Sequence, residues 1–336
     1  MAKIAINGFG RIGRLFFRQA FGHKDLDIVA INDLGDCENL AYLLKYDTVY
    51  RRYEKQVEAK NGKLVVDGKE VIFLQKRDPK ELPWKDLGID IVVESTGIFS
   101  EYTKAKAHID AGAKRVVITA PAKAGVEGAT VLMGINEGEM EKVVLTSNGS
   151  CTTNAVSPVI QIMKESLGIK KALLNTIHGY TATQNLVDGP VKGSKVRRGR
   201  AAAENIVPST TGAAISVALA IPELEGKFDG VAMRVPVLVG SVADITFLSA
   251  RETSVEEIND IFRKAAKEPR WDGIMTVTED PIVSSDIIGE PYGAIVDLAF
   301  TKVVDGDLVK VLSWYDNEWG YVATLVKHVV NVTALV

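Results

Sequence analysis

The reactive chemistry open to this chain is limited by its two cysteines and four histidines. Cys151 lies in the run SCTTN at 150–154, after a β-type run and before a helical pattern. The unpaired N–H groups of a helix N-terminus lower the pKa of a cysteine and favour the nucleophilic thiolate. We predict that Cys151 is the nucleophile, with a buried structural cysteine as the alternative. Cys37 lies between Asp36 and Glu38, whose charges oppose a thiolate, so we expect an unreactive surface or half-buried thiol.

A catalytic thiol needs a base, and His178 is the best placed histidine. It ends a predicted strand, 171–178, and begins a run of small and polar residues. At the strand ends of an α/β protein, side chains reach the ligand crevice. His23 in a charged loop, His108 on a predicted surface helix and His328 among valines are most simply structural or solvated. Cys151 and His178 therefore form the expected thiol–imidazole pair.

The first strand is followed by a glycine pattern, G-x-G-x-x-G, made by Gly8, Gly10 and Gly13. Such a loop permits a tight turn, a close approach of pyrophosphate and close helix–strand packing. Asp33 follows Gly13 by 20 residues, where a carboxylate can bind a ribose 2′-OH and repel a 2′-phosphate. We therefore predict NAD binding. The glycine pattern can also form a turn that binds no ligand, and Asp33 can be a turn former at the end of a strand. Arg77 is a weaker candidate, whose alternative is an ordinary surface arginine.

Several basic and hydroxyl residues of the second half could bind small anions. A basic run extends from Lys192 to Arg200, and an arginine there can hold a phosphate bidentately. The run lacks aromatic residues for base stacking and the chain carries a net charge of −3, so nucleic acid is not the expected partner. The segment 209–212 is a second anion candidate or simply a helix N-cap. Arg234 lies in an apolar strand and needs a partner if it is buried.

The elements that must position these residues change in character near residue 150. Before it, short apolar runs alternate with helical patterns, which indicates a parallel sheet with right-handed crossovers. After it, longer β-type runs predict an α+β domain with a mixed or antiparallel sheet. The fold class expected is therefore α/β, with a first domain at 1–150 and a second domain from residue 151. Expected strands are 3–6, 27–31, 63–66, 70–74, 89–94, 115–118, 130–133, 142–145, 171–178, 230–236, 241–248, 294–300 and 308–314, and expected helices 11–21, 38–45, 104–113, 154–167, 212–221 and 254–267, with 321–332 a helix or strand.

Composition excludes several other classes of protein. Two cysteines cannot build a disulfide framework or a Cys₄ zinc site, no metal site is expected, and a reducing compartment fits best. The N-terminus does not resemble a targeting peptide, and no apolar run reaches the 18 residues typical of a membrane span. We expect a cytoplasmic protein that does not act at a membrane.

Over essentially its full length the sequence resembles the glyceraldehyde-3-phosphate dehydrogenase family. SCTTN at 150–154 and WYDNEWGY at 314–321 are highly specific for that family. Further matching segments are INGFGRIGR at the start, INDL, LLKYD, ESTGIF at 94–99, TAPAK at 119–123, the histidine with TATQ, STTGAA at 209–214 and RVP at 234–236. The resemblance implies a Rossmann domain, a catalytic domain with a large mixed sheet, and a C-terminal helix, 317–336, returning to the first domain. It also implies a homotetramer with the basic loop at a subunit interface.

Residue roles follow from the same resemblance. It implies Cys151 as nucleophile and His178 as base in the oxidative phosphorylation of glyceraldehyde 3-phosphate with NAD and inorganic phosphate, through a hemithioacetal and a thioester. The residues implied for the NAD site are Gly8, Gly10, Arg11, Ile12, Gly13, Asp33, Arg77, Thr96, Thr119 and Asn317. Those implied for the substrate phosphate are Thr181 and Arg234, and for inorganic phosphate Ser150, Thr152, Thr211 and Gly212, with Arg198 nearby.

The sequence departs from the common family pattern at four places and leaves alternatives open. These departures bear on subunit packing and on the shape of the phosphate sites, but none removes a catalytic group. They are Ala155, Gly179, Ile215-Ser216 and the stretch 237–240. An erythrose-4-phosphate dehydrogenase is disfavoured by TATQ. A semialdehyde dehydrogenase would not need both phosphate sites. A non-catalytic nucleotide- or RNA-binding protein is disfavoured by the intact Cys151–His178 pair.

Overall fold

The structure is a computed structural model that describes residues 1–122, 127–191 and 193–336. Lys123 of the TAPAK segment and Lys192 of the basic run lie outside the described residues. The chain forms two compact units, one of Met1–Gly149 with Leu325–Val336 and one of Ser150–Thr324. The C-terminal segment forms a helix, α9 (Trp319–Thr333), whose residues are shared between the two units.

The first unit contains a nine-stranded sheet. Its strands run parallel from β10 to β7, and β7, β6 and β5 continue it as antiparallel hairpins. The parallel part is the expected Rossmann-type arrangement, because β1, β2 and β8 are joined through helical crossovers. In sheet order the strands are β10 (Gly128–Thr130), β11 (Leu145–Ser147), β9 (Arg115–Ile118), β8 (Ile91–Glu94), β1 (Ala2–Asn7), β2 (Leu26–Asn32), β7 (Lys69–Leu74), β6 (Lys63–Val66) and β5 (Val57–Lys60).

Short helices connect these strands. The expected helix over 104–113 is wrong in extent: the structure has two short helices instead, Tyr102–Ala105 and Ala107–Asp110. Gly112 then takes φ +107°, where a Cβ would lie 2.7 Å from the backbone of Lys85, so the helix cannot continue. The helices of this unit are α1 (Arg11–Ala20), α2 (Cys37–Lys45), α3 (Trp84–Leu87), α4 (Tyr102–Ala105) and α5 (Ala107–Asp110), and a two-stranded ribbon, β3 (Tyr46–Asp47) with β4 (Arg51–Arg52), follows α2.

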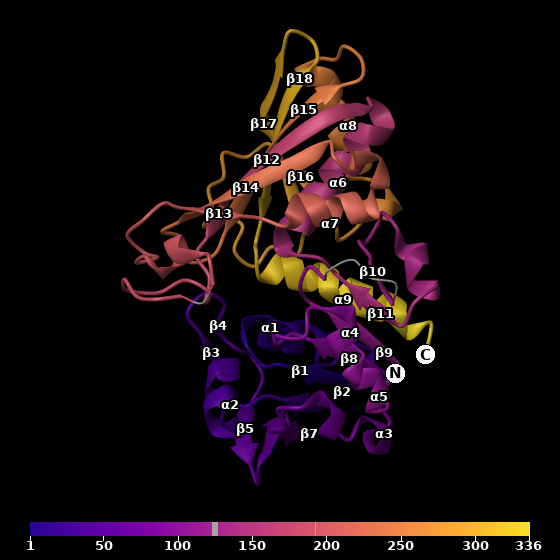
Figure 1. Cartoon of the computed structure of the whole chain (residues 1–336), viewed down its shortest axis with the longest axis vertical. Helices are drawn as coiled ribbons and strands as arrows, with labels where there is room; N and C mark the ends of the chain where they lie inside the picture. Colours follow the sequence, from indigo (N-terminus) through magenta and orange to yellow (C-terminus); the bar gives the residue numbers. More distant parts are fainter. Residues whose placement is uncertain (123–126, 192) are drawn as a thin grey trace. The chain divides into compact units, whose positions relative to one another are not determined.

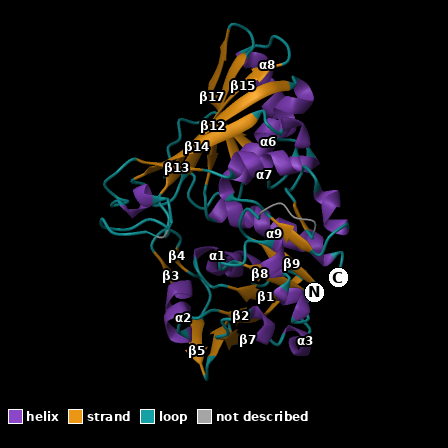
Figure 2. Cartoon of the chain, viewed as in Figure 1, coloured by secondary structure: helices purple, strands orange, loops and turns teal. Residues whose placement is uncertain are grey.

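The second unit contains a seven-stranded mixed sheet, which confirms the predicted fold class. Strand pairs β12·β14 and β16·β17 are parallel, and the other neighbours are antiparallel. The order is β13 (Val207–Thr210), β14 (Phe228–Val235), β12 (Ile169–Gly179), β15 (Ser241–Ser249), β18 (Leu308–Tyr315), β17 (Ala294–Val304) and β16 (Met275–Thr278). Figure 1 shows α6 (Cys151–Ser166), α7 (Ala213–Ala220) and α8 (Val255–Ala265) beside the strands of this sheet, and Figure 2 shows the same helices in purple against the orange strands.

Some predicted boundaries need correction. The helix expected from residue 154 begins at Cys151, because Ser150 and Thr153 form a capping box that satisfies the first N–H groups. The strands expected at 130–133 and 142–145 are instead Gly128–Thr130 and Leu145–Ser147. The strands β3, β4, β5, β13 and β16 were not expected from periodicity. Within the described part of the chain, no helix has the length and apolar character needed to cross a membrane.

Candidate active site

Cys151 and His178 lie together in the second unit. Cys151 is the first residue of α6 and His178 lies near the end of β12. Sγ of Cys151 is 3.4 Å from Nε2 of His178, which is within hydrogen-bonding reach for sulfur. The imidazole is buried, whereas the cysteine keeps partial solvent contact. A strand end and a helix start thus bring together the only thiol–imidazole pair that the sequence analysis singled out.

The surroundings of Cys151 and His178 shift the pKa values of the two side chains in opposite directions. Burial raises the pKa of the Cys151 thiol, while the positive charge of Arg234 and a hydrogen bond from Thr152 act to lower it. Burial and Arg234 together lower the pKa of His178 to about 3. The backbone N–H groups of Cys151 and Thr152 at the helix start lower the thiol pKa as expected, but desolvation of the thiolate is the larger effect, so the net shift is upward. At neutral pH the imidazole is therefore uncharged.

Arg234 lies on the far side of the His178 ring. Its Nη1 is 2.7 Å from Nδ1 of His178 and 3.2 Å from the carbonyl oxygen of Gly179. The same Nδ1 is 2.6 Å from that carbonyl oxygen. A guanidinium can only donate and a carbonyl can only accept, so these two neighbours favour opposite tautomers of the ring. The partners that Arg234 needs in its half-buried strand position are thus the His178 ring and the Gly179 carbonyl.

Tyr315 was not identified from the sequence, although it lies within the WYDNEWGY segment. Its hydroxyl is 2.9 Å from the hydroxyl of Thr152 and 2.7 Å from that of Thr176. Its ring packs edge-on against the His178 imidazole, with centroids 5.9 Å apart. Thr176 shares the buried face of β12 with His178, because residues two apart on a strand point to the same side. The spacing of two residues between Thr176 and His178 is the sequence signal that points to Thr176.

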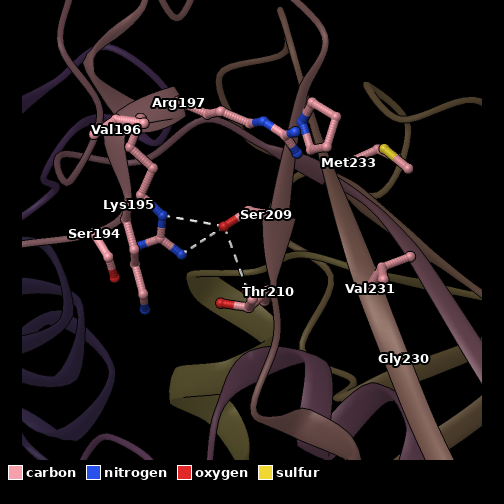
Figure 3. Close-up of a pocket in the computed structure, with 11 residues that line it drawn as sticks. Ser194, Lys195, Val196, Arg197, Ser209, Thr210, Gly230, Val231 and Met233 are labelled. Atoms are coloured by element: carbon pink, nitrogen blue, oxygen red, sulfur yellow. Dashed lines mark hydrogen bonds between the residues drawn. The ribbon is translucent and has the colours of Figure 1, made fainter.

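The residues implied for phosphate binding fall into two groups. Thr181 contacts Thr183 at 2.9 Å between hydroxyl oxygens, and Nη1 of Arg198 donates to Thr183 at 3.5 Å. Arg198 also donates to the hydroxyl of Ser209 through Nε at 3.1 Å and Nη2 at 2.9 Å. A pocket of about 570 Å³ opens beside them, and Figure 3 shows Lys195, Arg197 and Ser209 along its wall.

The second group lies at the starts of two helices that pack against each other, α6 and α7. Ser150 caps α6 through the backbone N–H of Thr153 at 3.1 Å. Thr152 is buried, and its hydroxyl lies 4.0 Å from Sγ of Cys151. Thr211 accepts a hydrogen bond from the N–H of Ala213 at the start of α7, and the exposed Gly212 follows Thr211. Both helix starts therefore present hydroxyl groups together with N–H donors.

The glycine loop of the first unit has the geometry that a dinucleotide needs. Gly8 has φ +95°, and a Cβ there would lie 2.6 Å from the backbone nitrogen of Thr96. A Cβ on Gly13 would lie 2.1 Å from the carbonyl oxygen of Gly8, so both positions require glycine. At Gly10 a Cβ would meet no described protein atom within 4 Å, so the space beside this residue is open to an external group. These residues fit a pyrophosphate at the start of α1.

The other candidate NAD residues are placed as follows. Asp33 accepts from the N–H of Phe9 at 2.6 Å and of Gly35 at 2.8 Å, which holds its carboxylate beside the loop. Arg11 is paired with Asp47, while Ile12 is half-buried in α1. Thr96 follows β8 and Thr119 follows β9, while Arg77 is exposed after β7. Asn317 belongs to the second unit. Its side chain accepts hydrogen bonds from the N–H of Gly240 at 3.1 Å and from the hydroxyl of Ser241 at 2.9 Å.

The remaining cysteine and histidines take no part in the thiol site. Cys37 is half-buried, as expected, and burial raises its pKa, with further contributions from Asp36 and Glu38. His328 is fully buried and contacts Thr146 and Asn148. The prediction of a surface position for His108 is wrong, because the residue is completely buried. Its ring packs against those of Trp84 and Phe99, which lie outside its helix.

Comparison with known proteins identifies the family. Residues 2–102 match the model "Glyceraldehyde 3-phosphate dehydrogenase, NAD binding domain", and residues 150–317 match "Glyceraldehyde 3-phosphate dehydrogenase, C-terminal domain". The chain is 49% identical to the glyceraldehyde-3-phosphate dehydrogenase of Borreliella burgdorferi, over 95% of this chain and 96% of the relative. It is 48% identical to that of Streptomyces coelicolor, over 96% of each chain, and 46% identical to glyceraldehyde-3-phosphate dehydrogenase 2 of Bacillus subtilis, over 97% of this chain and 96% of the relative. The chain therefore belongs to the glyceraldehyde-3-phosphate dehydrogenase family.

Proposed function

We propose that this chain oxidises D-glyceraldehyde 3-phosphate and captures the product with inorganic phosphate as 1,3-bisphosphoglycerate, with NAD as the hydride acceptor. The single observation that carries the proposal is the 3.4 Å approach of the Cys151 sulfur to the His178 imidazole at the start of α6. A thiol next to a base is suited to covalent catalysis on an aldehyde. NAD, when bound, supplies the acceptor for the hydride that leaves the aldehyde carbon.

The chain's own residues move the protons and hold the charge. His178 takes the thiol proton at Nε2 as the Cys151 sulfur attacks the aldehyde carbon. The developing oxyanion is stabilised by the Cys151 N–H and by the protonated imidazole, which then returns the proton to give a hemithioacetal. As hydride departs, His178 accepts the hydroxyl proton and a thioester remains on Cys151. Inorganic phosphate attacks the thioester carbon, and the sulfur leaves as the acyl phosphate forms.

Two anion sites support this sequence of steps. We assign the substrate's C3 phosphate to Thr181 and Arg234, and inorganic phosphate to Ser150, Thr152, Thr211 and Gly212, with Arg198 nearby. The contact of Arg198 with Thr183, and of Thr183 with Thr181, supports placing the two sites close to each other. Helix starts with hydroxyl groups suit a small dianion.

Arg234 links substrate binding to the base. A phosphate that draws the guanidinium away from Nδ1 of His178 leaves the Gly179 carbonyl as its partner. Nδ1 then carries the ring proton and Nε2 presents its lone pair to the thiol. Substrate binding therefore selects the tautomer that the first step requires.

The first unit supplies the dinucleotide site in this proposal. We assign residues 1–150 with the helix at 317–336 to the NAD-binding domain, and 151–316 to the catalytic domain. Asp33, oriented by Phe9 and Gly35, favours NAD because its carboxylate would repel a 2′-phosphate. Asn317 has its amide oxygen engaged by Gly240 and Ser241, so its amide nitrogen is the atom it offers to the nicotinamide. The other assigned residues are Gly8, Gly10, Arg11, Ile12, Gly13, Arg77, Thr96 and Thr119.

The assembly and location are also part of the proposal. We infer a homotetramer that works in the cytoplasm. Exposed apolar side chains on the seven-stranded sheet, Leu173 at 65% and Val231 at 48%, support burial against another subunit. Two unpaired thiols in the chain support a reducing compartment.

The proposal is tested by following NADH absorbance with glyceraldehyde 3-phosphate and NAD, with and without inorganic phosphate. Sustained turnover is expected only with phosphate. Turnover that does not depend on phosphate would contradict the acyl-phosphate route, and no turnover would favour a non-catalytic nucleotide-binding protein. Erythrose 4-phosphate serves as the competing substrate, and a higher kcat/KM for it would instead favour the longer aldehyde.

A further inference from the structure

A chain of buried hydrogen bonds lies at the carboxyl ends of the parallel strands in the first unit. Asn7 ends β1, Asn32 ends β2 and Glu94 ends β8, and all three side chains are buried. Trp84 of α3 and His108 of α5 are fully buried and extend the chain on one side. We define these five residues as the strand-end network. Nothing in the proposed chemistry of the thiol uses it.

The network has one consistent set of proton positions. The indole Nε1 of Trp84 can only donate, and it lies 3.0 Å from Nδ1 of His108, so Nδ1 accepts. The ring proton therefore lies on Nε2, which is 3.1 Å from Oε2 of Glu94 and 3.3 Å from Nδ2 of Asn7. Of these two atoms only the carboxylate oxygen can accept, so Nε2 donates to Glu94. Trp84 thus selects the tautomer of His108 that donates to Glu94.

Glu94 is the centre of the network and receives only donors. Its Oε2 accepts from His108 and, at 2.5 Å, from Nδ2 of Asn7. Its Oε1 accepts from the N–H of Thr96 at 2.8 Å and also from the Thr96 hydroxyl. Four donors on two oxygens require a carboxylate at this position, because an amide would present an NH₂ group to at least one of them.

Thr96 transmits this arrangement to the glycine loop. The Gly8 position is so close to the Thr96 backbone that a Cβ would lie 2.6 Å from its nitrogen. Ser95 also donates through its hydroxyl to the carbonyl oxygen of Gly8 at 2.6 Å. Asn7 precedes Gly8, and its Oδ1 accepts from Asn32 at 2.7 Å. The loop is thus held on one side by Asn7 and on the other by the segment that Glu94 fixes.

We propose that His108 and Glu94 are positioning residues for the dinucleotide: through Thr96 and Asn7 they hold the Gly8–Gly13 loop in the conformation that binds NAD. The inference rests on the proposed function only in taking NAD as the ligand. It predicts that the network sets NAD affinity and leaves the thiol chemistry of the second unit unchanged.

The test compares isosteric variants within the network. Glu94→Gln should weaken NAD binding, measured by titration calorimetry, by about tenfold or more, because buried donors lose their acceptor. Trp84→Phe removes only the indole N–H that selects the tautomer and should weaken binding in the same direction. Trp84→Phe therefore tests the proposal even if Glu94→Gln fails to fold. His108→Gln, whose amide can donate to Glu94 and accept from Trp84, should retain more affinity than Glu94→Gln.

His328→Gln is the matched control, because His328 is equally buried in the same unit but lies outside the network. It should lower the melting temperature without changing the Kd for NAD. The rate of Cys151 alkylation in the absence of NAD should be equal in wild type and all network variants. The proposal is overturned if folded Glu94→Gln and Trp84→Phe bind NAD within twofold of wild type, or if His328→Gln weakens binding equally. Failure of the wild-type chain to bind NAD would instead contradict the proposed function.

Discussion

Nη1 of Arg234 lies 2.7 Å from Nδ1 of His178, on the side of the imidazole opposite to Cys151. The cation that we assign to the substrate phosphate and the base of the proposed mechanism are therefore in direct contact. The positive charge lowers the pKa of both His178 and Cys151. Because both pKa values respond to the same side chain, the guanidinium affects chemistry as well as affinity.

Arg234→Gln should raise the pKa of the Cys151 thiol, because the positive charge that stabilises the thiolate is lost. Alkylation by iodoacetamide, a neutral reagent, should be slower at pH 7, and its pH midpoint should move upward. KM for glyceraldehyde 3-phosphate should rise as well. Arg263→Gln, which removes an exposed arginine paired with Asp260 and Glu279, is the control. An unchanged midpoint in Arg234→Gln would exclude an electrostatic role for Arg234.

Substitution of the two catalytic groups should give unequal losses. Cys151→Ala should abolish turnover, because no nucleophile remains to form the thioester. His178→Asn should leave a slow residual rate, about 10²–10⁴-fold below wild type, as is typical when a general base is removed. Steady-state kcat from NADH absorbance measures both. Comparable kcat in wild type and Cys151→Ala would show that Cys151 is not the nucleophile.

Tyr315→Phe should destabilise the second unit while leaving most of the activity. Burial raises the pKa of Tyr315, so its hydroxyl stays protonated and bridges Thr152 and Thr176. Loss of that bridge takes one partner from each of two buried hydroxyls, although Thr176 keeps its bond to the Val242 carbonyl, and should cost about 1–3 kcal/mol of unfolding free energy. The ring contact with His178 remains, so kcat should change less than in His178→Asn. Thermal melting and kcat together check this, and a kcat loss as large as that of His178→Asn would assign Tyr315 to the chemistry itself.

The pH dependence of stability should reflect His328. Its burial lowers its pKa to about 3 from an ordinary 6.5, so between these values the unfolded chain binds a proton that the folded chain does not. Stability should therefore fall as the pH drops through this window, by at most ~1.4 kcal/mol per pH unit from this residue. Between pH 7 and pH 5, the melting temperature of His328→Gln should fall less than that of wild type. An equal loss in both proteins would mean that His328 does not contribute.

Much of the fold and of the site follows from local sequence patterns. The turn at Asp67-Gly68 joins β6 and β7 as a hairpin, as its residue types predict. The spacing of Gly8, Gly10 and Gly13 with Asp33 predicts the dinucleotide-binding loop. His178 at the end of its strand lies beside Cys151, because helix starts and strand ends meet in such folds. These features depend on neighbours in sequence or on recurring topology.

The features that sequence patterns do not predict depend on tertiary packing. His108 lies on a helix whose pattern is compatible with a surface position, and its burial comes from Trp84, Glu94 and Phe99. The raised thiol pKa of Cys151 also requires knowledge of the packing around it, because a helix N-terminus alone predicts the opposite direction. Periodicity contains neither kind of information.

In the proposed mechanism, an acyl group is held on Cys151 until inorganic phosphate removes it. Rapid mixing of the protein with NAD and glyceraldehyde 3-phosphate, without phosphate, should give a burst of NADH equal to the concentration of active sites. The reaction should then stall, and intact-mass measurement should show the chain carrying one acyl group that phosphate releases. A burst of this size, absent in Cys151→Ala, is the result we predict. Continued NADH formation without phosphate, or phosphate-dependent turnover with no acylated chain, would contradict the account.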